Sequence, residues 1–222
     1  FFSIIAHDLK NPFNTVIGLS ELLLYRYDNY DDDKIKEFIG QINKFSSNAY
    51  NLLDNLLQWA RSQTGRIKVN KSQINICKLV DENFHLMQDK ANEKSLELIN
   101  KVNGSLICWA DKNMINTVIR NLISNALKFT EENGYIKVTS EDSGKDQVKI
   151  SVVDNGTGID QEEIPKLFKI STNFSKDGTN SETGTGLGLI LCHEFIEKND
   201  GQIWVESEKG KGSCFNFTIP KA

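Results

Sequence analysis

Two long runs of apolar residues at helical spacing occupy the first 64 residues and restrict the fold more than any other feature of the chain. In residues 5–23 an apolar side chain recurs at every third or fourth position, which is the a/d spacing of packed helices. A second apolar row, from Phe2 to Leu24, widens this face. Another helical pattern covers residues 35–60, after an acidic break at residues 27–33. Two such helices cannot bury their wide faces alone, so we expect an α-helical hairpin that dimerises into a four-helix bundle.

The pattern changes near Gly65, and we expect two domains, residues 1–65 and 66–222. The second part mixes helical and strand periodicities, which predicts an α+β two-layer sandwich. Its expected helices cover residues 77–95, 111–130 and 187–198, and its expected strands cover residues 136–141, 147–153, 202–206 and 215–219. Residues 169–186 are rich in Ser, Thr, Asn and Gly, and a loop of that length inside a domain is usually functional.

The composition excludes several classes of protein. The 222 residues carry 30 acidic and 26 basic side chains, a net charge of −4, so the chain has no basic footprint for nucleic acid. No apolar run is long enough to span a bilayer, and we expect no membrane contact by this piece itself. The four cysteines are widely spaced, which fits a reducing cytosol. The chain starts without Met or a signal peptide, so we expect a fragment of a longer protein.

A polar stripe with the same spacing runs beside the first apolar seam. It contains His7, Asn11, Asn14, Gly18 and Glu21. The neighbouring Asp8 can accept a hydrogen bond from one imidazole nitrogen and leave the other lone pair free for nucleophilic attack. A lone histidine on a helix is more often an ordinary surface residue, and this alternative stays open at the level of the stripe alone.

A second candidate site lies in residues 121–130. Asn121, Asn125 and Lys128 share one face of the expected helix. Amides on the buried side of an apolar helix are costly unless they bind something. An amide oxygen is a ligand that Mg²⁺ accepts, and lysine suits phosphate as a point charge. A helix with polar ends is the alternative.

Two glycine-containing motifs complete the candidate residues. Asp154 directly follows an expected strand, and its carboxylate could accept the exocyclic amine of adenine while Gly156 and Gly158 permit close approach of the backbone. Alone, this motif is also an ordinary turn. Residues 184–189 open a helix whose free amides suit phosphate, but their GxGxG spacing and the absence of a preceding strand argue against a dinucleotide site.

Taken in order, these motifs resemble the catalytic core of sensor histidine kinases over essentially the whole chain. Residues 2–12 resemble the H-box, 121–130 the N-box, 154–159 the G1 box and 184–189 the G2 box. Phe168 and Phe174 flank a divergent form of the F-box that lacks the usual Pro-Phe pair. The resemblance implies a dimerisation and histidine-phosphotransfer hairpin followed by an ATP-binding domain of the Bergerat type.

The resemblance also implies a role for each motif residue. His7 would be the phosphoacceptor, Asp8 its orienting acid and Asn11 a residue for phosphatase activity toward the regulator. Asn125 would hold Mg²⁺, and Asp154 would bind the adenine amine. The remaining nucleotide-binding residues would be Asn121, Lys128 at the phosphates, Phe129 near adenine, Gly156, Gly158, Gly184, Gly186, Leu187 and Gly188.

The implied function is ATP- and Mg²⁺-dependent autophosphorylation of His7 in a homodimer, followed by transfer to an aspartate in the receiver domain of a response regulator. That partner would dock along the stripe at Asn14, Gly18 and Glu21. The piece would be the cytoplasmic portion of a membrane-anchored protein whose sensor domain lies upstream.

Two alternatives come from other classes of protein. A plain ATPase of the gyrase and chaperone superfamily shares the nucleotide fold but lacks the H-box hairpin. It also carries a glutamate one helical turn before its metal-binding asparagine, where this chain has Asn121. A degenerate, non-enzymatic scaffold would usually have lost one of His7, Asn125, Asp154 or the glycines of residues 184–188.

Overall fold

A computed structural model describes residues 2–63, 68–144, 146–169, 179 and 186–222 of the chain. The chain divides into two compact units, Phe1–Thr64 and Gly65–Ala222, which are described separately. No helix among the described residues combines the length and the apolar character needed to cross a bilayer.

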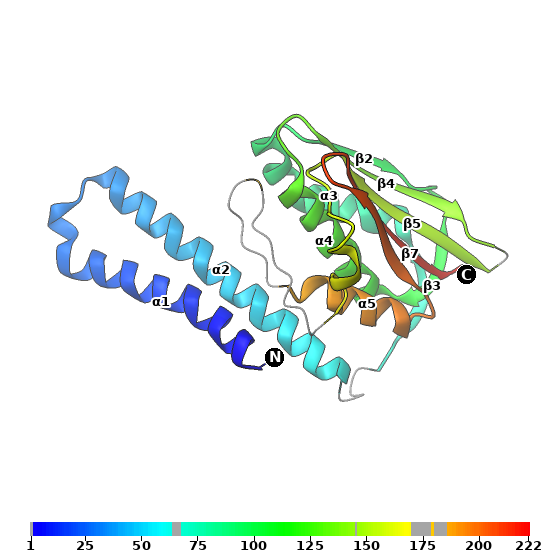
Figure 1. The fold of residues 1–222 in the computed structure, drawn as a ribbon, viewed down its shortest axis with the longest axis horizontal. Helices are drawn as coiled ribbons and strands as arrows, with labels where there is room; N and C mark the ends of the chain where they lie inside the picture. Colours follow the sequence, from blue (N-terminus) through cyan, green and yellow to red (C-terminus); the bar gives the residue numbers. More distant parts are fainter. Residues whose placement is uncertain (1, 64–67, 145, 170–178, 180–185) are drawn as a thin grey trace. The chain divides into compact units, whose positions relative to one another are not determined.

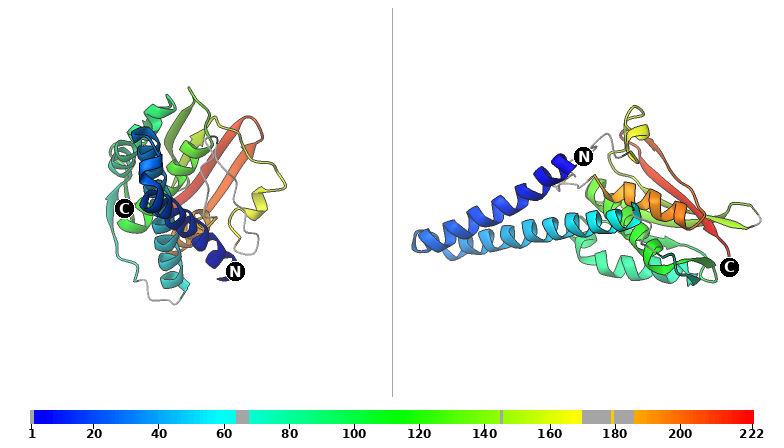
Figure 2. Two further views of the ribbon diagram at one scale, coloured as in Figure 1. Left: turned by 90° about the vertical axis from the view of Figure 1, so that its left-hand side faces the viewer. Right: turned by 90° about the horizontal axis from the view of Figure 1, so that it is seen from below.

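The first unit is a helical hairpin. Helix α1 (Phe2–Arg26) and helix α2 (Asp32–Gln63) pack along each other and are joined by the short 3₁₀ helix η1 (Tyr27–Asn29) (Figure 2). The Asp31 carboxylate accepts a hydrogen bond of 2.8 Å from the Lys34 amide and so satisfies one free donor at the start of α2. The predicted hairpin is therefore confirmed, and α1 continues through Pro12.

The apolar faces of this hairpin are only partly covered within one chain. On α2, Phe38, Ala49 and Leu52 are buried, as expected for residues that face α1. Among the described side chains of the two helices, one phenylalanine and five aliphatic residues remain well exposed. They are Phe13 (48%), Ile17 (54%) and Leu24 (77%) on α1, and Ile39 (54%), Leu53 (40%) and Leu57 (46%) on α2. Apolar side chains exposed in this number on one hairpin indicate an interaction surface.

The second unit is built on a five-stranded sheet with the order β2-β4-β5-β7-β6. Strand β2 runs parallel to β4, and the other neighbours are antiparallel. A separate antiparallel pair joins β1 and β3. The strands are β1 (Lys71–Asn75), β2 (Glu97–Lys101), β3 (Ile107–Asp111), β4 (Tyr135–Asp142), β5 (Gln147–Asp154), β6 (Ile203–Glu208) and β7 (Gly212–Pro220).

Three helices cover one face of this sheet (Figure 1). They are α3 (Ile76–Glu93), α4 (Lys112–Phe129) and α5 (Gly188–Lys198), and α4 packs against both of the others. Alternate residues of the strands point into the shared core, as period-two side chains must. The largest fully buried side chains include Ile115, Ile119, Leu122 and Ile123 on α4 and Ile136, Ile150, Phe217 and Ile219 on the sheet. The predicted two-layer sandwich is confirmed.

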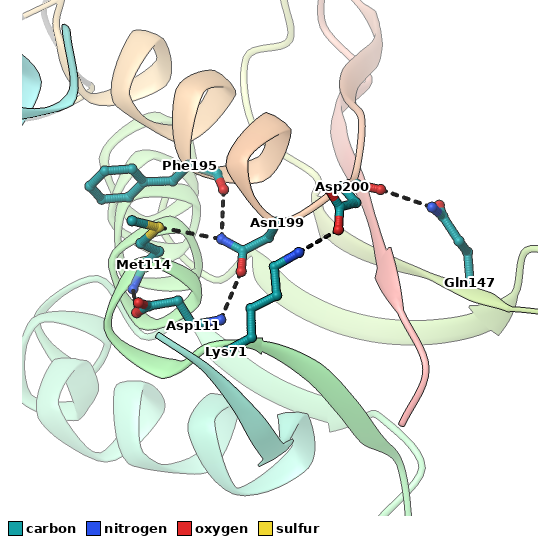
Figure 3. Close-up of polar contacts among 7 residues, drawn as sticks. All are labelled: Lys71, Asp111, Met114, Gln147, Phe195, Asn199 and Asp200. Carbon is teal, nitrogen blue, oxygen red and sulfur yellow. Dashed lines mark hydrogen bonds and ion pairs between the residues drawn. The ribbon is translucent and has the colours of Figure 1, made fainter. Parts of the chain in front are cut away.

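A buried polar cluster fixes the start of α4 against the end of α5 (Figure 3). The side-chain Oδ1 of Asn199 accepts a hydrogen bond of 2.7 Å from the backbone amide of Asp111, and the side-chain Nδ2 of Asn199 donates to the Phe195 backbone carbonyl at 2.8 Å. Next to it, Lys71 of β1 forms an ion pair with Asp200, whose carbonyl accepts from Gln147 at 2.9 Å. Because Asn199 is fully buried and makes both hydrogen bonds, it connects the N-cap residue of α4 to the last turn of α5.

The sequence missed three strands. β1 carries a single buried apolar residue, and β2 and β3 are only five residues long, so neither alternation nor length distinguishes them from loops. The helix expected over residues 77–95 ends at Glu93, because Ser95 adopts a positive φ of 53°. Most of the loop expected over residues 169–186 lies outside the described residues.

Candidate active site

Helix α4 carries the candidate residues of the N-box. Its first turn is capped by the Asp111 carboxylate, which accepts hydrogen bonds from the Asn113 and Met114 amides at 3.0 and 3.1 Å. One side of the helix fills the core, while Asn121, Asn125 and Lys128 are half-buried. These three side chains therefore lie at the margin of the core, where a ligand can reach them.

Asp154 ends β5 and is almost fully buried, with 5% of its surface exposed. Its Oδ1 accepts hydrogen bonds from the amides of Gly156 at 2.9 Å and Ser213 at 3.2 Å. Burial raises the pKa of Asp154 to about 6, and these two amides lower the pKa against that effect. Both hydrogen bonds end on Oδ1, so Oδ2 is the oxygen left to accept a proton donor from a ligand.

The glycines of the G1 motif serve the protein's own packing. A Cβ on Gly156 would lie 2.3 Å from the Phe129 carbonyl oxygen, and a Cβ on Gly158 would lie 2.1 Å from the Glu208 carbonyl oxygen. Gly158 also has a positive φ of 66°, which favours glycine. In this structure the two glycines let the turn approach α4 and β6, and the close approach of this backbone to a ligand stays a prediction.

The same close approach connects the Asp154 turn to the last turn of α4. The Thr157 amide donates to the Phe129 carbonyl at 3.1 Å. The Lys128 ammonium nitrogen lies 4.8 Å from the centre of the Phe129 ring, within cation–π distance. Asp154, Lys128 and Phe129 are thus positioned by one tightly packed contact between α4 and the turn after β5.

The start of α5 lies against α4. Leu187 is buried, Gly186 has a φ of 67°, and a Cβ on Gly188 would lie 3.6 Å from the Asn121 side chain. The Asn121 amide nitrogen is buried without a hydrogen-bond partner of normal geometry among the described residues. The structure therefore brings Asn121 together with residues 186–188, whereas Gly184 lies outside the described residues.

The divergent F-box lies partly within the described residues. Phe168 lies with its ring centre 5.9 Å from that of His193 on α5, and Leu167 beside it is buried. His193 Nδ1 lies 3.4 Å from a carboxylate oxygen of Glu197 one turn later. The Phe168 ring thus packs on α5 although the usual Pro-Phe pair is lacking, and Phe174 is outside the described residues.

The remaining candidate residues belong to the first unit. His7, Asp8 and Asn11 all lie in α1, and Asn11 is exposed. The other two histidines, His85 on α3 and His193 on α5, belong to the second unit. The candidate nucleophile and the candidate nucleotide residues therefore come from different units.

Among the described residues no three His, Cys, Asp or Glu side chains gather into a metal site. The candidate metal ligand near Lys128, the residue expected to bind phosphate, is the side-chain amide oxygen of Asn125. One amide oxygen suits Mg²⁺, because Mg²⁺ commonly takes one or two protein ligands and completes its shell with phosphate oxygens and water. The residues present are therefore compatible with Mg²⁺ held jointly with a nucleotide.

Two residues of this region were missed by the sequence analysis. Ser213 donates to Asp154 because β7 pairs with β5 in a register that places the two residues opposite each other. Lys94 is buried, and its ammonium group contacts the end of α4. No local sequence signal marks either one, since each contact depends on pairing between distant segments.

Comparison with known proteins extends over both units. A family model described as His Kinase A (phospho-acceptor) domain matches residues 1–65. Another, described as Histidine kinase-, DNA gyrase B-, and HSP90-like ATPase, matches residues 110–222. The adaptive-response sensory kinase SasA of Crocosphaera subtropica is 32% identical over 223 residues, which cover 98% of this chain and 58% of SasA. The chain thus spans little more than half the length of that relative.

Two solved structures are similar in fold and sequence. The catalytic domain of histidine kinase ThkA has a TM-score of 0.60 and 34% identity, and the match covers 68% of this chain and 98% of that domain. The crystal structure of ThkA in complex with the response regulator protein TrrA has a TM-score of 0.75 and 27% identity, covering all of this chain and 61% of that chain. The likeness thus includes the hairpin as well as the sandwich.

Proposed function

The chain belongs to the histidine kinase family, and from this premise we propose that it transfers the γ-phosphoryl group of ATP to His7 and then to an aspartate of a response regulator. The observation that carries the proposal is the Asp154 site: a buried carboxylate with one oxygen held by the protein and one left for adenine, joined by Thr157 to the α4 turn that bears Lys128. The test is incubation with γ-labelled ATP, which should yield label that is lost in acid, kept in base and passed to a receiver domain.

The nucleotide is placed by the second unit. Asp154 Oδ2 accepts the adenine amine, and Lys128 binds the phosphates with its charge. Asn121 and residues 186–188 would line the phosphate side, because the start of a helix directs backbone amides toward an anion. Asn125 would hold Mg²⁺, which neutralises phosphate charge when bound. These residues bind and orient ATP, and the nucleophile comes from the first unit.

The transfer itself needs little covalent chemistry from the protein. A neutral imidazole nitrogen of His7 attacks the γ-phosphorus, the bond from that phosphorus to the bridging oxygen breaks, and ADP leaves with the electron pair. Asp8 would accept a hydrogen bond from the other ring nitrogen and so fix the tautomer. Because the reacting groups are on different units, we assign the rate enhancement mainly to positioning.

The regulator would dock on α1 beside the phosphorylated histidine. Asn14 and Glu21 are exposed on this helix. The ThkA relative was crystallised in complex with a response regulator, which supports a partner of the same class here. Asn11, one turn after His7, would position water for hydrolysis of the phospho-aspartate.

The uncovered apolar face of the hairpin supports a homodimer. Phe13, Ile17 and Leu24 of α1 are 48–77% exposed in the single chain, and a second copy would bury them in a four-helix bundle. We also propose, from the class of the relatives alone, that this piece is the cytoplasmic portion of a membrane-anchored sensor.

The metal assignment predicts the effect of Asn125→Ala. Loss of the amide oxygen should raise the Mg²⁺ concentration needed for half-maximal labelling by about tenfold or more. The fold should persist, because Asn125 is only half-buried. Labelling is measured across a Mg²⁺ titration, with Ser124→Ala, an exposed neighbour on the same helix, as the matched control. A wild-type midpoint in Asn125→Ala would show that the metal is held elsewhere.

The ATPase alternative is tested at Asn121. An amide cannot take a proton from water at neutral pH, so ATP bound here should hydrolyse very slowly. In a His7→Gln parent, which cannot be phosphorylated at that residue, Asn121→Glu should raise steady-state phosphate release by about a hundredfold. Asn121→Gln adds the same chain length without a base and should have no such effect. Rapid turnover by the parent would favour the plain ATPase, and no rise with glutamate would reject a missing base as the reason.

A further inference from the structure

Lys94, in the turn after α3, is buried and reaches the C-terminal end of α4. Only 6% of the Lys94 surface is exposed. The ammonium nitrogen lies 2.9 Å from the Leu127 carbonyl oxygen, 3.4 Å from that of Lys128 and 2.8 Å from the Thr179 hydroxyl oxygen. A cavity of about 340 Å³ beside this cluster is lined by Lys94, Glu131, Glu132 and Thr179. A buried ammonium group at the C-terminal end of α4 can stabilise that end of the helix.

The end of a helix presents carbonyl groups without helical partners and carries partial negative charge. Lys94 satisfies two of these groups on α4, and one of them belongs to Lys128 itself. The Lys94 carbonyl in turn accepts a hydrogen bond of 3.0 Å from the Asn133 amide, in the turn that leads to β4. One residue therefore ties together α3, the last turn of α4 and the following turn.

Thr179 meets the same carbonyl of Lys128. Its amide donates to that oxygen at 3.0 Å, and its hydroxyl lies 3.2 Å from it and 3.3 Å from the Thr130 carbonyl oxygen. The hydroxyl accepts from Lys94 and can donate to one of the two carbonyls at a time. Lys94 thus connects the last turn of α4 with a residue that lies between the F-box and the G2 motif in sequence.

We propose that Lys94 is a positioning residue of the nucleotide site. By holding the carbonyls of Leu127 and Lys128 and the hydroxyl of Thr179, it fixes the backbone from which the Lys128 and Phe129 side chains project toward the nucleotide. Lys94 itself does not touch ATP. The inference rests on the proposed function, because it assigns Lys94 a role only if ATP binds at this end of α4.

The test compares Lys94→Met with Lys94→Arg in the full chain. Methionine keeps the apolar stem and removes the donors and the charge, whereas arginine retains both. We expect Lys94→Met to raise the Kd and KM for ATP by about tenfold with a much smaller change in kcat, and Lys94→Arg to recover most of the affinity. Lys90→Met, on the exposed side of the last turn of α3, is the matched control and should bind ATP like the wild type.

A purely structural role would give a different result. It would lower the melting temperature of Lys94→Met but leave the ATP affinity of the folded protein unchanged. That outcome would overturn the role of Lys94 without affecting the proposed function. If Lys94→Met does not fold, Thr179→Val is the second variant, because it removes only the hydroxyl of an exposed residue. This second variant should bind ATP about threefold more weakly, and unchanged affinity would again overturn the inference. A wild-type protein that does not bind ATP would overturn the proposed function as well.

Discussion

Replacing His7 with glutamine is expected to reduce labelling from γ-labelled ATP to background while leaving ATP affinity within about twofold of the wild type. Glutamine approximates the size of histidine, but its amide nitrogen has no lone pair available for attack on phosphorus. ATP binding should persist because the proposed nucleotide residues belong to the second unit, whereas His7 lies in α1 of the first. Label is followed by gel autoradiography, and ATP binding by calorimetry.

The other two histidines provide the controls for this prediction. His85 is exposed on α3, and His193 packs against Phe168 on α5. His85→Gln should be labelled like the wild type, and His193→Gln should retain acid-labile label even if its rate changes. Persistent acid-labile label on His7→Gln, or its loss on His85→Gln, would contradict the assignment of the nucleophile.

Elements with strong periodicity were predictable from the sequence. The apolar seam of α1 and the β-branched residues of β4 and β5 specify a helix and two strands, and the structure contains them. β1 shows the limit of such patterns. Only Ile74 of its five residues is buried, and the strand exists because it pairs with β3 more than thirty positions later. Long-range pairing of this kind leaves no local trace.

In the candidate site, too, local motifs could be predicted from the sequence and long-range contacts could not. Asp154 could be selected because it follows a strand and precedes two glycines in a motif of recognisable order. Its second hydrogen-bond donor, Ser213, is 59 positions away and is set by the register of β5 against β7. Lys94 gives no signal in sequence, because a buried lysine is recognised only by the helix end that it contacts. The candidate ligand-binding residue Asp154 was therefore predictable from its residue type and motif, whereas Ser213 and Lys94, which contact the site from distant segments, were not.

The largest effect in the nucleotide site is expected from Asp154→Asn. The asparagine carbonyl can still accept from the Gly156 and Ser213 amides, but its NH₂ group would face the adenine amine, donor against donor. We expect ATP affinity to fall by about a hundredfold, in line with loss of a charge-assisted hydrogen bond and an opposed pair of donors. Calorimetry with ATP measures this, and Asp146→Asn, an exposed carboxylate of the same unit, is the control.

The same substitution should not weaken the fold. Burial raises the pKa of Asp154 from its ordinary value of 3.8 to about 6, so the folded protein holds this proton more tightly than the unfolded chain. The favourable contribution of the protonated group is complete below about pH 3.8 and is lost as pH rises through about 6. At pH 7 the ionised carboxylate therefore costs stability, up to about 3 kcal/mol. Asp154→Asn should raise the free energy of unfolding at pH 7, measured with urea and without nucleotide, by up to that amount.

The pH dependence of binding separates this explanation from simple damage to the site. Below about pH 6 a proton on Oδ2 turns the acceptor for adenine into a donor, so wild-type ATP affinity should fall by up to tenfold per pH unit. Asp154→Asn should show only the titration of ATP's own phosphates. A carboxylate that is costly for the folded protein at pH 7 and required for its ligand is the pattern expected of a binding group. Equal pH profiles in the two proteins, or an asparagine variant that is both destabilised and fully able to bind ATP, would contradict the adenine role of Asp154.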